Sequence, residues 1–441
     1  MRILYLTHQY FPRHVGGTEV YTHALAQRAR RAGHEAAVVT YHESASANPR
    51  RFGPYGRWHD GIRVWELHYN LQVSPEPARY EFHNPVIAGW IADLLDDLRP
   101  DLVHATHLMK LSGAAIEPCL ARGIPVMVTL TDFWAICPRH TLLRWNEVVC
   151  DGPGHRLDCV RCVHATHGFA STAPLHLSDI ELIPGLYRSL RASSPDNRLG
   201  GELRAMADRN PYLRTLLGKV RARIALSGFQ KKFYVANGFP EDSIQVIPHG
   251  PAEEDVVRTG HRPGRLPRVV FIGALVPQKG AHILLEALAR APELSIECRI
   301  YGPMKPRTEY RDRLRSLGSN DRRVRLTGEF QPRDLSRILS EADIVVIPST
   351  WHENAPFIAK AARRLGIPVL ASRVGSLEES LPSPPAKFFR AGDAHDLQAG
   401  LVAILDESAW LHRVPDLTTP TLEEHAQKIF EIYARETGQP W

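Results

Sequence analysis

One segment, residues 343–379, constrains the fold most, because it has the pattern of a strand, a loop, a helix and a second strand. The apolar runs Ile344–Ile347 and Pro368–Ala371 predict two buried parallel strands. Between them, Pro356 stands where proline is tolerated at the start of a helix. Ligands bind beyond the carboxyl ends of such strands, so we expect Glu353, in the loop after the first strand, to face a ligand. The helix start would offer free N–H groups to an anion.

Short apolar runs alternate with helical patterns along the whole chain, which predicts parallel sheets with helices on both faces. At 441 residues the chain is too long for one typical core and suits two domains. The predicted fold class is therefore α/β, with two Rossmann-like, doubly wound parallel sheets and a cleft between them. The predicted strands of the first half are Ile3–Thr7, Ala36–Thr40, Ile62–Leu67, Leu102–His104, Pro125–Leu130 and Ile224–Leu226. Those of the second half are Arg268–Ile272, Ser295–Tyr301, Val324–Leu326, Ile344–Ile347 and Val369–Ala371.

The domain change is expected between Ser227 and Pro267, where proline and charged residues are typical of a linker. We therefore assign residues 1–226 to an N-terminal domain and residues 227–415 to a second domain, followed by a C-terminal segment, residues 416–441. Residues 133–222 are predicted to be an insertion in the first domain. Its helical patterns cover Ile183–Arg191 and Leu203–Val220.

Two glycine-containing loops have the arrangement that brings backbone N–H groups close to a phosphate or a sugar. Gly16 and Gly17 follow the first predicted strand and precede a helix that begins near Thr18. Lys279 and Gly280 precede a helix predicted over Ala281–Ala289, whose dipole would favour a diphosphate. A glycine pair alone is weak evidence, because it is also typical of a tight turn.

Four of the six cysteines are clustered, and the last two of them form a Cys-x-x-Cys pair. A reducing compartment keeps thiols free, so this spacing favours a metal site, either a structural zinc or an iron–sulfur cluster. Disulfides and free thiols remain the alternatives. The predicted ligands are Cys137, Cys150, Cys159 and Cys162, with His140, His155, His164 and His167 as substitutes. Cys119 and Cys298 are predicted to be buried as small apolar residues.

Charge and hydropathy exclude some functions. The formal net charge of +6 suits an anionic nucleotide or membrane surface but is too small to indicate nucleic-acid binding. No apolar run reaches the 18 or more residues of a membrane helix, and no signal segment precedes the first strand. We expect a cytoplasmic protein. The arginines of the insertion fit either a solvated helix face or a basic surface in peripheral contact with the inner face of a membrane.

Five segments, in order, resemble the family four retaining glycosyltransferases, which have the two-domain GT-B fold. The first is MRILYLTHQYFPRHVGGTEVYTHALAQRARRAGHEAAVVT, at the amino terminus. The others are LSGFQKKFYVANGFPEDSIQVIPHG, FIGALVPQKGAHILLEAL, the acidic-loop segment that contains Glu353, and VGSLEE. Together they cover almost the whole chain.

The resemblance implies transfer of a hexosyl group from a nucleotide diphosphate sugar to a glycan, lipid-linked or small-molecule acceptor, as in polysaccharide biosynthesis, without a catalytic metal. It implies catalytic roles for Glu353 and Asp132, and weaker acceptor-side roles for His104 and Arg139. In the family, the last helix returns to the first domain, here Leu422–Tyr433. The donor would be bound by Gly16, Gly17, Lys279, Gly280, Glu353, Asn354, Ala355 and Pro356.

Three positions depart from the family pattern. Ala274 stands where the family usually has the arginine of the diphosphate site, and Ala361 stands where it has the glutamate that holds the ribose. Thr131 replaces a histidine that lies near the transferred sugar. These changes permit an alternative, in which the chain is a degenerate subunit that scaffolds or activates a partner transferase. A sugar-nucleotide epimerase of the same fold is disfavoured, because the motifs follow the transferases.

Overall fold

The computed structural model describes residues 1–152, 156–167, 198–251, 265–304, 308–331, 334–381, 386–407, 416 and 418–441. They form two compact units, which are described separately. The first unit contains Met1–Leu226, Lys231–Ile247 and Ala426–Trp441. The second contains Ser227–Gln230 and Pro248–His425.

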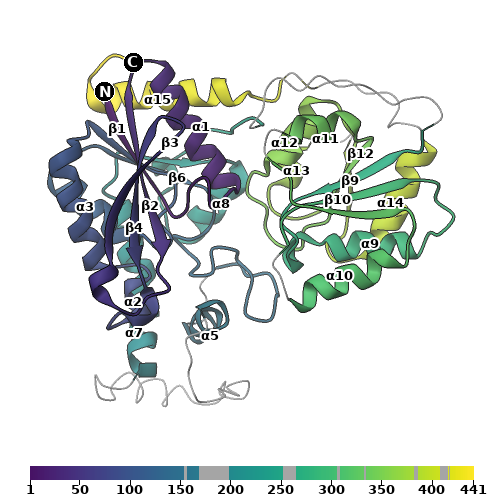
Figure 1. Cartoon of the computed structure of the whole chain (residues 1–441), viewed down its shortest axis with the longest axis horizontal. Coiled ribbons are helices and arrows are strands. Elements are labelled where there is room, and N and C mark those ends of the chain that lie inside the picture. Colours follow the sequence, from purple (N-terminus) through teal and green to yellow (C-terminus); the bar gives the residue numbers. More distant parts are fainter. Residues whose placement is uncertain are drawn as a thin grey trace. The chain divides into compact units, whose positions relative to one another are not determined.

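The first unit is built on an eight-stranded sheet with the order β3-β4-β2-β1-β5-β6-β7-β8 (Figure 1). Neighbouring strands are parallel except β3 and β4, which form an antiparallel edge hairpin. The central strands are buried on both faces, as their continuous apolar runs predict. The strands are β1 (Arg2–Thr7), β2 (Glu35–Glu43), β3 (Gly53–His59), β4 (Ile62–Tyr69), β5 (Leu102–Ala105), β6 (Val126–Leu130), β7 (Ala222–Ala225) and β8 (Ile244–Val246).

Helices of this unit pack around the sheet, and several have clear start signals. For example, α3 begins with Pro85 after Asn84, whose side-chain Oδ1 accepts hydrogen bonds from the N–H groups of Val86 and Ile87. At the carboxyl end of the chain, α15 packs against β1 and β5 through Tyr433, which contacts Tyr5 and His104, and both termini are close together in Figure 1. The helices are α1 (Gly17–Arg31), α2 (Pro77–Tyr80), α3 (Pro85–Leu98), α4 (Glu117–Ala121), α5 (Arg156–His167), α7 (Arg198–Leu217), α8 (Gly228–Ala236) and α15 (Leu422–Thr437).

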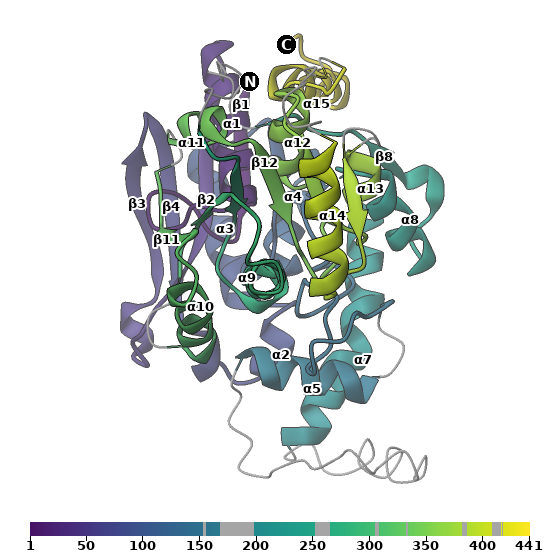
Figure 2. The same ribbon diagram turned by 90° about the vertical axis from the view of Figure 1, so that its right-hand side faces the viewer.

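The second unit contains a fully parallel, six-stranded sheet with the order β11-β10-β9-β12-β13-β14. One apolar cluster joins this sheet to α9, α10 and α14, and another joins its opposite face to α11, α12 and α13 (Figures 1 and 2). The strands are β9 (Arg268–Ile272), β10 (Glu297–Tyr301), β11 (Val324–Gly328), β12 (Ile344–Ile347), β13 (Val369–Ser372) and β14 (Lys387–Phe389). The helices are α9 (Ala281–Ala289), α10 (Glu309–Ser319), α11 (Leu335–Glu341), α12 (Phe357–Arg364), α13 (Leu377–Ser380) and α14 (Ala394–Asp406).

The structure differs from the sequence expectations at several elements. The edge strands β3, β8 and β14 were not predicted, nor was α5, which carries the Cys-x-x-Cys pair. Residues Lys231–Ile247, assigned by sequence to the second domain, belong to the first unit because β8 extends its sheet beside β7. The predicted helix Ile183–Arg191 lies outside the described residues. Within the described ranges, every helix is too short or too polar to cross a membrane.

The predicted basic surface of the insertion is not uniformly exposed. On α7, Arg209 is only 1% exposed and forms an ion pair with buried Glu81, with 2.9 Å between Nε and Oε2. Its guanidinium also donates a hydrogen bond to the carbonyl of Trp134 and lies over the Trp134 ring. Arg209 therefore holds α7 against the core and is not part of a lipid-facing surface.

Candidate active site

In each sheet, two neighbouring strands mark the topological switch point. The connections from these two strands lead to opposite edges of the sheet. In the first sheet this point lies between β1 and β5, and in the second it lies between β9 and β12. Loops at the carboxyl ends of such strands form the usual ligand-binding crevice of open α/β sheets. Lys279 and Glu353 lie in the loops after β9 and β12, whereas Asp132 follows β6, the strand next to β5.

In the second unit, the loops after β9 and β12 touch each other. The N–H of Thr350 donates to the carbonyl of Gln278 at 2.9 Å. Gly280, which precedes α9, has a left-handed backbone with φ of 75°. A Cβ atom there would lie 1.8 Å from the carbonyl oxygen of Pro348, so only glycine permits this approach. The close packing places Lys279 beside the acidic loop.

Lys279 and Glu353 form an ion pair, with 2.6 Å between Nζ and Oε1. Ser349 Oγ and Trp351 Nε1 donate to the same oxygen at 2.6 and 2.9 Å, and Lys279 also lies over the Trp351 ring. Burial alone would raise the pKa of Glu353, but the charge and hydrogen bond of Lys279 lower it overall. In the part of the chain that the structure describes, no hydrogen bond reaches Oε2 of Glu353. One carboxylate oxygen is therefore fixed, and the other has capacity for a ligand hydroxyl.

The backbone of the acidic loop is held by the turn after β13. The N–H of Ser376 donates to the carbonyl of Glu353 at 2.8 Å, and a Cβ at Gly375 would lie 2.3 Å from that oxygen. Asn354 accepts a hydrogen bond from Ser227 Oγ at 3.0 Å. Pro356 lies at the N-cap of α12. The loop is thus rigidly positioned, while Glu353 itself is only 4% exposed.

The two altered positions of this unit differ in their surroundings. Ala274 is partly exposed directly after β9, whereas Ala361 is buried in the apolar cluster under α12. Its neighbour Lys360, which the sequence reasoning missed, is only 6% exposed, and no ion pair reaches it among the described residues. Burial, followed by the charge of Arg363, lowers the pKa of Lys360 to about 8. The only sequence signal for this residue is a lysine between alanines on a buried helix face.

In the first unit, Asp132 follows β6 and pairs with His107, which follows β5. His107 Nε2 donates to Asp132 Oδ2 at 2.6 Å, and the N–H of Met109 donates to His107 Nδ1 at 3.0 Å. This arrangement places the imidazole proton on Nε2. The N–H of Trp134 donates to Asp132 Oδ1 at 2.8 Å. Burial would raise the pKa of Asp132, but His107 lowers it overall, so the carboxylate is ionised and oriented.

The glycine loop contributes a second acid to this region. The ring of His8, after β1, lies 4.2 Å from that of His107, and its Nε2 lies 3.7 Å from Oε1 of Glu19. Glu19 is buried in the first turn of α1, where burial raises its pKa although its carboxyl group accepts backbone hydrogen bonds, including one from Gly16. Gly16 and Gly17 are exposed at the helix start. The N-terminus of α1 is therefore already occupied by a carboxylate, which suits an uncharged ligand better than a phosphate.

Three other residues named from the sequence have structural contacts. His104 is fully buried, with Nδ1 2.5 Å from the hydroxyl of Tyr433 and Nε2 2.8 Å from Thr129 Oγ1. Both ring nitrogens are therefore used in buried hydrogen bonds, one of which attaches α15 to the sheet. Thr131 donates to the carbonyl of Thr106, and Arg139 binds the carbonyl of Arg144. His107, which the sequence reasoning also missed, is the histidine that orients Asp132.

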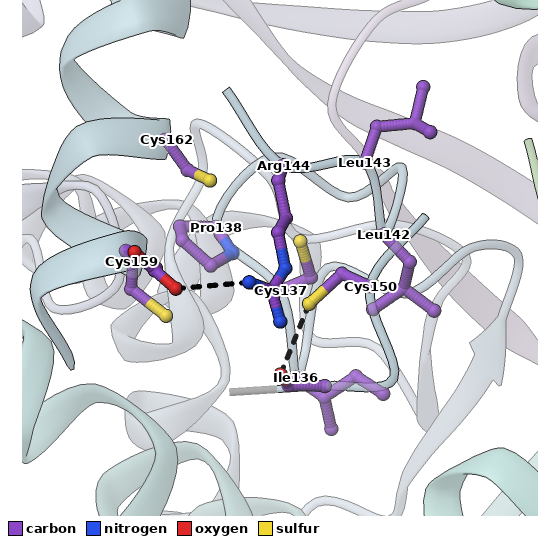
Figure 3. Close-up of a pocket in the computed structure, with 11 residues that line it drawn as sticks. Ile136, Cys137, Pro138, Leu142, Leu143, Arg144, Cys150, Cys159 and Cys162 are labelled. Carbon is purple, nitrogen blue, oxygen red and sulfur yellow. Dashed lines mark hydrogen bonds and ion pairs between the residues drawn. The ribbon is translucent and has the colours of Figure 1, made fainter. Parts of the chain in front are cut away.

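The four clustered cysteines line one small cavity of about 30 Å³ (Figure 3). Cys137 comes from the loop after β6, Cys150 from a turn closed by the bridge between Leu143 and Val149, and the other two from α5. All four are free thiols. Burial raises the pKa of Cys137 to about 11 and that of Cys159 to about 12.

Two parallel α/β units with polar loops at their switch points define a nucleotide-binding class of fold. Residues 16–250 match the glycosyl transferase 4-like domain, and residues 266–407 match the glycosyl transferases group 1 domain. The first match alone covers more than half of the 441 residues. The chain belongs to the family-4 type of glycosyltransferases with the GT-B fold.

Solved structures share the fold of this chain, and a curated relative is similar to part of its sequence. Sucrose-phosphate synthase from Thermosynechococcus elongatus is 17% identical, with a TM-score of 0.64 and 98% of both chains covered. Anabaena HepE, in complex with UDP and glucose, is 16% identical, with a TM-score of 0.61 and 98% and 99% covered. D-inositol 3-phosphate glycosyltransferase of Corynebacterium efficiens is 34% identical over 117 residues, which are 25% of this chain and 27% of that relative. The chain therefore matches only about a quarter of this curated relative's length.

Proposed function

We propose that this protein transfers a sugar, with retention of anomeric configuration, from a nucleotide diphosphate sugar to an acceptor hydroxyl. The observation that carries the proposal is the Lys279–Glu353 pair at the switch point of the second sheet, beside the start of α9. A nucleotide donor is supported by HepE, whose solved structures contain UDP and UDP-glucose. The name of the curated relatives supports glycosyl transfer.

The residues of the second unit suit the departure of a nucleoside diphosphate. In this reaction the bond between the anomeric carbon and the diphosphate oxygen breaks, and a bond to the acceptor oxygen forms on the same face of the sugar. The acceptor's proton passes to the leaving diphosphate. Negative charge grows on that group, where Lys279 and the uncapped N–H groups of α9 stabilise it. Glu353 Oε2 accepts a hydrogen bond from a hydroxyl of the donor sugar.

The first unit supplies the second carboxylate of the proposal. Asp132 is partly exposed, ionised and held by His107 and Trp134, so it accepts a hydrogen bond from an incoming hydroxyl in a fixed direction. Acceptors that present such hydroxyls are growing glycans, lipid-linked sugars and polar small molecules. The reaction thus belongs to the assembly of a polysaccharide or glycoconjugate.

The test is turnover by the purified chain against a panel of nucleotide sugars and acceptors. Glu353→Gln keeps the shape of the side chain but weakens its hold on Lys279 and the sugar, and we expect turnover to fall by about 10²- to 10³-fold. Glu378→Gln is the matched control, because Glu378 is an exposed partner of Arg373 in the same region. It should leave turnover within about twofold.

The alternative, a scaffold for a partner transferase, gives a different result. A scaffold shows no turnover alone, and the activity of its partner is unchanged by Glu353→Gln. Retention is tested separately by following the anomeric configuration of the product with proton NMR. An inverted product would refute the stereochemical part of the proposal alone.

A further inference from the structure

The cavity between β6 and α5 has the composition of a metal site rather than of an ordinary core. Its four thiols come from three separate segments, so their convergence is a property of the fold and not of one short motif. Cys159 and Cys162 are three residues apart on α5, which puts both on the same side of the helix. Ile136, Pro138, Leu142 and Leu143 supply apolar walls. Figure 3 shows Cys159 and Cys162 on one side and Cys137 and Cys150 on the other, with the Arg144 side chain between them.

We propose that Cys137, Cys150, Cys159 and Cys162 bind a single zinc ion as four thiolates. Sulfur ligands favour zinc or iron–sulfur clusters among the metals of proteins. Four thiolates from three segments, two of them in a Cys-x-x-Cys pair, are the usual closed ligand set of a structural zinc site. With four protein ligands the zinc has no open position, so the site is structural.

The charges around the cavity fit this assignment. A zinc ion with four thiolates carries a net charge of −2, which needs positive neighbours in a partly buried place. Arg144 lines the cavity and reaches Asp158. The positive charges of Arg209 and Arg139 act on Cys137 and Cys162 respectively.

The site would connect the insertion to the carboxyl end of β6. Cys137 lies five residues after Asp132, and the intervening Trp134 binds both Asp132 and Arg209 of α7. α5 also packs on α7. Zinc bound to Cys137 and to α5 would therefore complete a ring of contacts that runs from Asp132 through Trp134 and α7 to α5. Binding of the ion should therefore stabilise this region without touching a reactant.

Two histidine groups are competing candidates, and the experiment must separate them. The ligand atoms of His23, His59 and Asp60, and those of His42, Glu66 and His68, lie within 4.8 Å of one another. The cysteine sulfurs are spread more widely, so their side chains must turn inward to bind. In the second histidine group, however, Glu66 is already bound by Arg57 and Arg13, whose charges oppose a cation. The first group offers only three ligands, and Asp60 is well exposed.

The experiment is elemental analysis of the full chain, produced in medium that contains zinc and iron and purified without chelator. We expect about one zinc per chain and negligible iron. Cys159→Ser/Cys162→Ser should lose the zinc. Cys119→Ala/Cys298→Ala, which changes the two buried cysteines outside the cavity, should keep it, as should His23→Ala/His59→Ala.

Stoichiometric iron with acid-labile sulfide, absence of both metals, or zinc retained by Cys159→Ser/Cys162→Ser would each overturn the proposal. If that double variant does not fold, growth of the wild-type chain with cobalt replaces it. Four thiolates give Co²⁺ intense sulfur-to-metal charge-transfer absorption and tetrahedral visible bands. Histidine and carboxylate ligands give no such charge-transfer absorption, and that result would also overturn the assignment.

Discussion

The two switch-point sites differ in how their charged side chains are paired. In the second unit, a lysine and a glutamate pair beside a helix start that has no side-chain cap. In the first unit, an aspartate accepts a hydrogen bond from a histidine, and the nearby helix start is occupied by Glu19. The second site is thus suited to a phosphate, and the first to hydroxyl groups. The comparison shows that two units of similar fold differ in ligand preference because different residues stand in the loops after their central parallel strands.

Buried cations extend this comparison and give the largest expected effects on stability. In the first unit Arg209 is paired with Glu81, whereas in the second unit Lys360 has no ion pair within the described ranges. Arg209→Met leaves a buried carboxylate unpaired and should reduce the free energy of unfolding by about 3–5 kcal/mol. Lys360→Met removes a cation that is costly to bury, and at pH 7 it should raise that free energy by up to about 3 kcal/mol.

The pH dependence of Lys360 has a defined sign. Its pKa is about 8 in the folded chain and 10.5 as a model value, so the unfolded chain binds more protons between these pH values. The unfolding free energy of the wild type should therefore gain a rising contribution from pH 8 to 10.5 that Lys360→Met lacks. Urea unfolding at pH 7 and pH 10 measures both variants. Equal effects at the two pH values would show that the lysine is not buried in its charged form.

Asp132 tests the hydroxyl-binding character of the first site. Asp132→Asn replaces an acceptor-only carboxylate with an amide, which competes with the hydrogen bond from His107 and cannot hold a hydroxyl in the same way. We expect kcat to fall by about 10²-fold while the affinity for the nucleotide diphosphate stays within about twofold. Asp96→Asn, at an exposed ion pair with Arg122, is the control and should be neutral. Loss of nucleotide affinity in Asp132→Asn would remove the distinction between the two sites.

Lys279 tests the phosphate-binding character of the second site. Lys279→Met removes a charge-assisted contact of about 1.5–3 kcal/mol, so the Kd for UDP or ADP should rise by roughly 10- to 100-fold. The same change releases Glu353 from its ion pair and should raise the pKa of that carboxyl. Isothermal titration calorimetry measures the affinity. An unchanged Kd would mean that the diphosphate binds elsewhere.

The sequence predicted the second unit better than the first for a physical reason. β9, β12 and α9 have the predicted bounds, because each is a continuous apolar or amphipathic run. The polar residues predicted to form the site of this unit, such as Lys279 and Glu353, also stand in short loops marked by nearby glycine and proline residues. Nothing in the sequence predicts that Lys279 pairs with Glu353, since 74 residues separate them.

The first site was less accessible to sequence reasoning because it is assembled from three separate loops. His107 follows β5 without any motif, and its role depends on Asp132 and on the backbone of Met109. His104, in contrast, precedes it by three residues and is a core residue bound to α15. α5 was missed because cysteines, histidines and charged residues interrupt its apolar periodicity. The cysteine spacing predicted a metal site formed by its thiols with Cys137 and Cys150, and the four side chains line one cavity.

The smallest expected effect comes from restoring charge at Ala274. At the second switch point the positive charge of Lys279 is balanced by Glu353, so an added arginine would give this site the net positive charge that a diphosphate favours. Ala274 is partly exposed directly after β9, which leaves room for a longer side chain. Ordering that side chain costs up to about 2 kcal/mol, which offsets most of the gain. We expect Ala274→Arg to tighten UDP or ADP binding by no more than about tenfold.

Ala274→Met is the matched control, because it adds similar length without charge. The gain of the arginine variant should shrink as salt is raised from 0.05 to about 0.5 M, since exposed charges are screened. Equal tightening by methionine and arginine would assign the effect to packing. If only the arginine variant binds the nucleotide more weakly, the site already has all the positive charge that the diphosphate needs. That result would contradict the idea that the balanced charges of Lys279 and Glu353 limit nucleotide affinity.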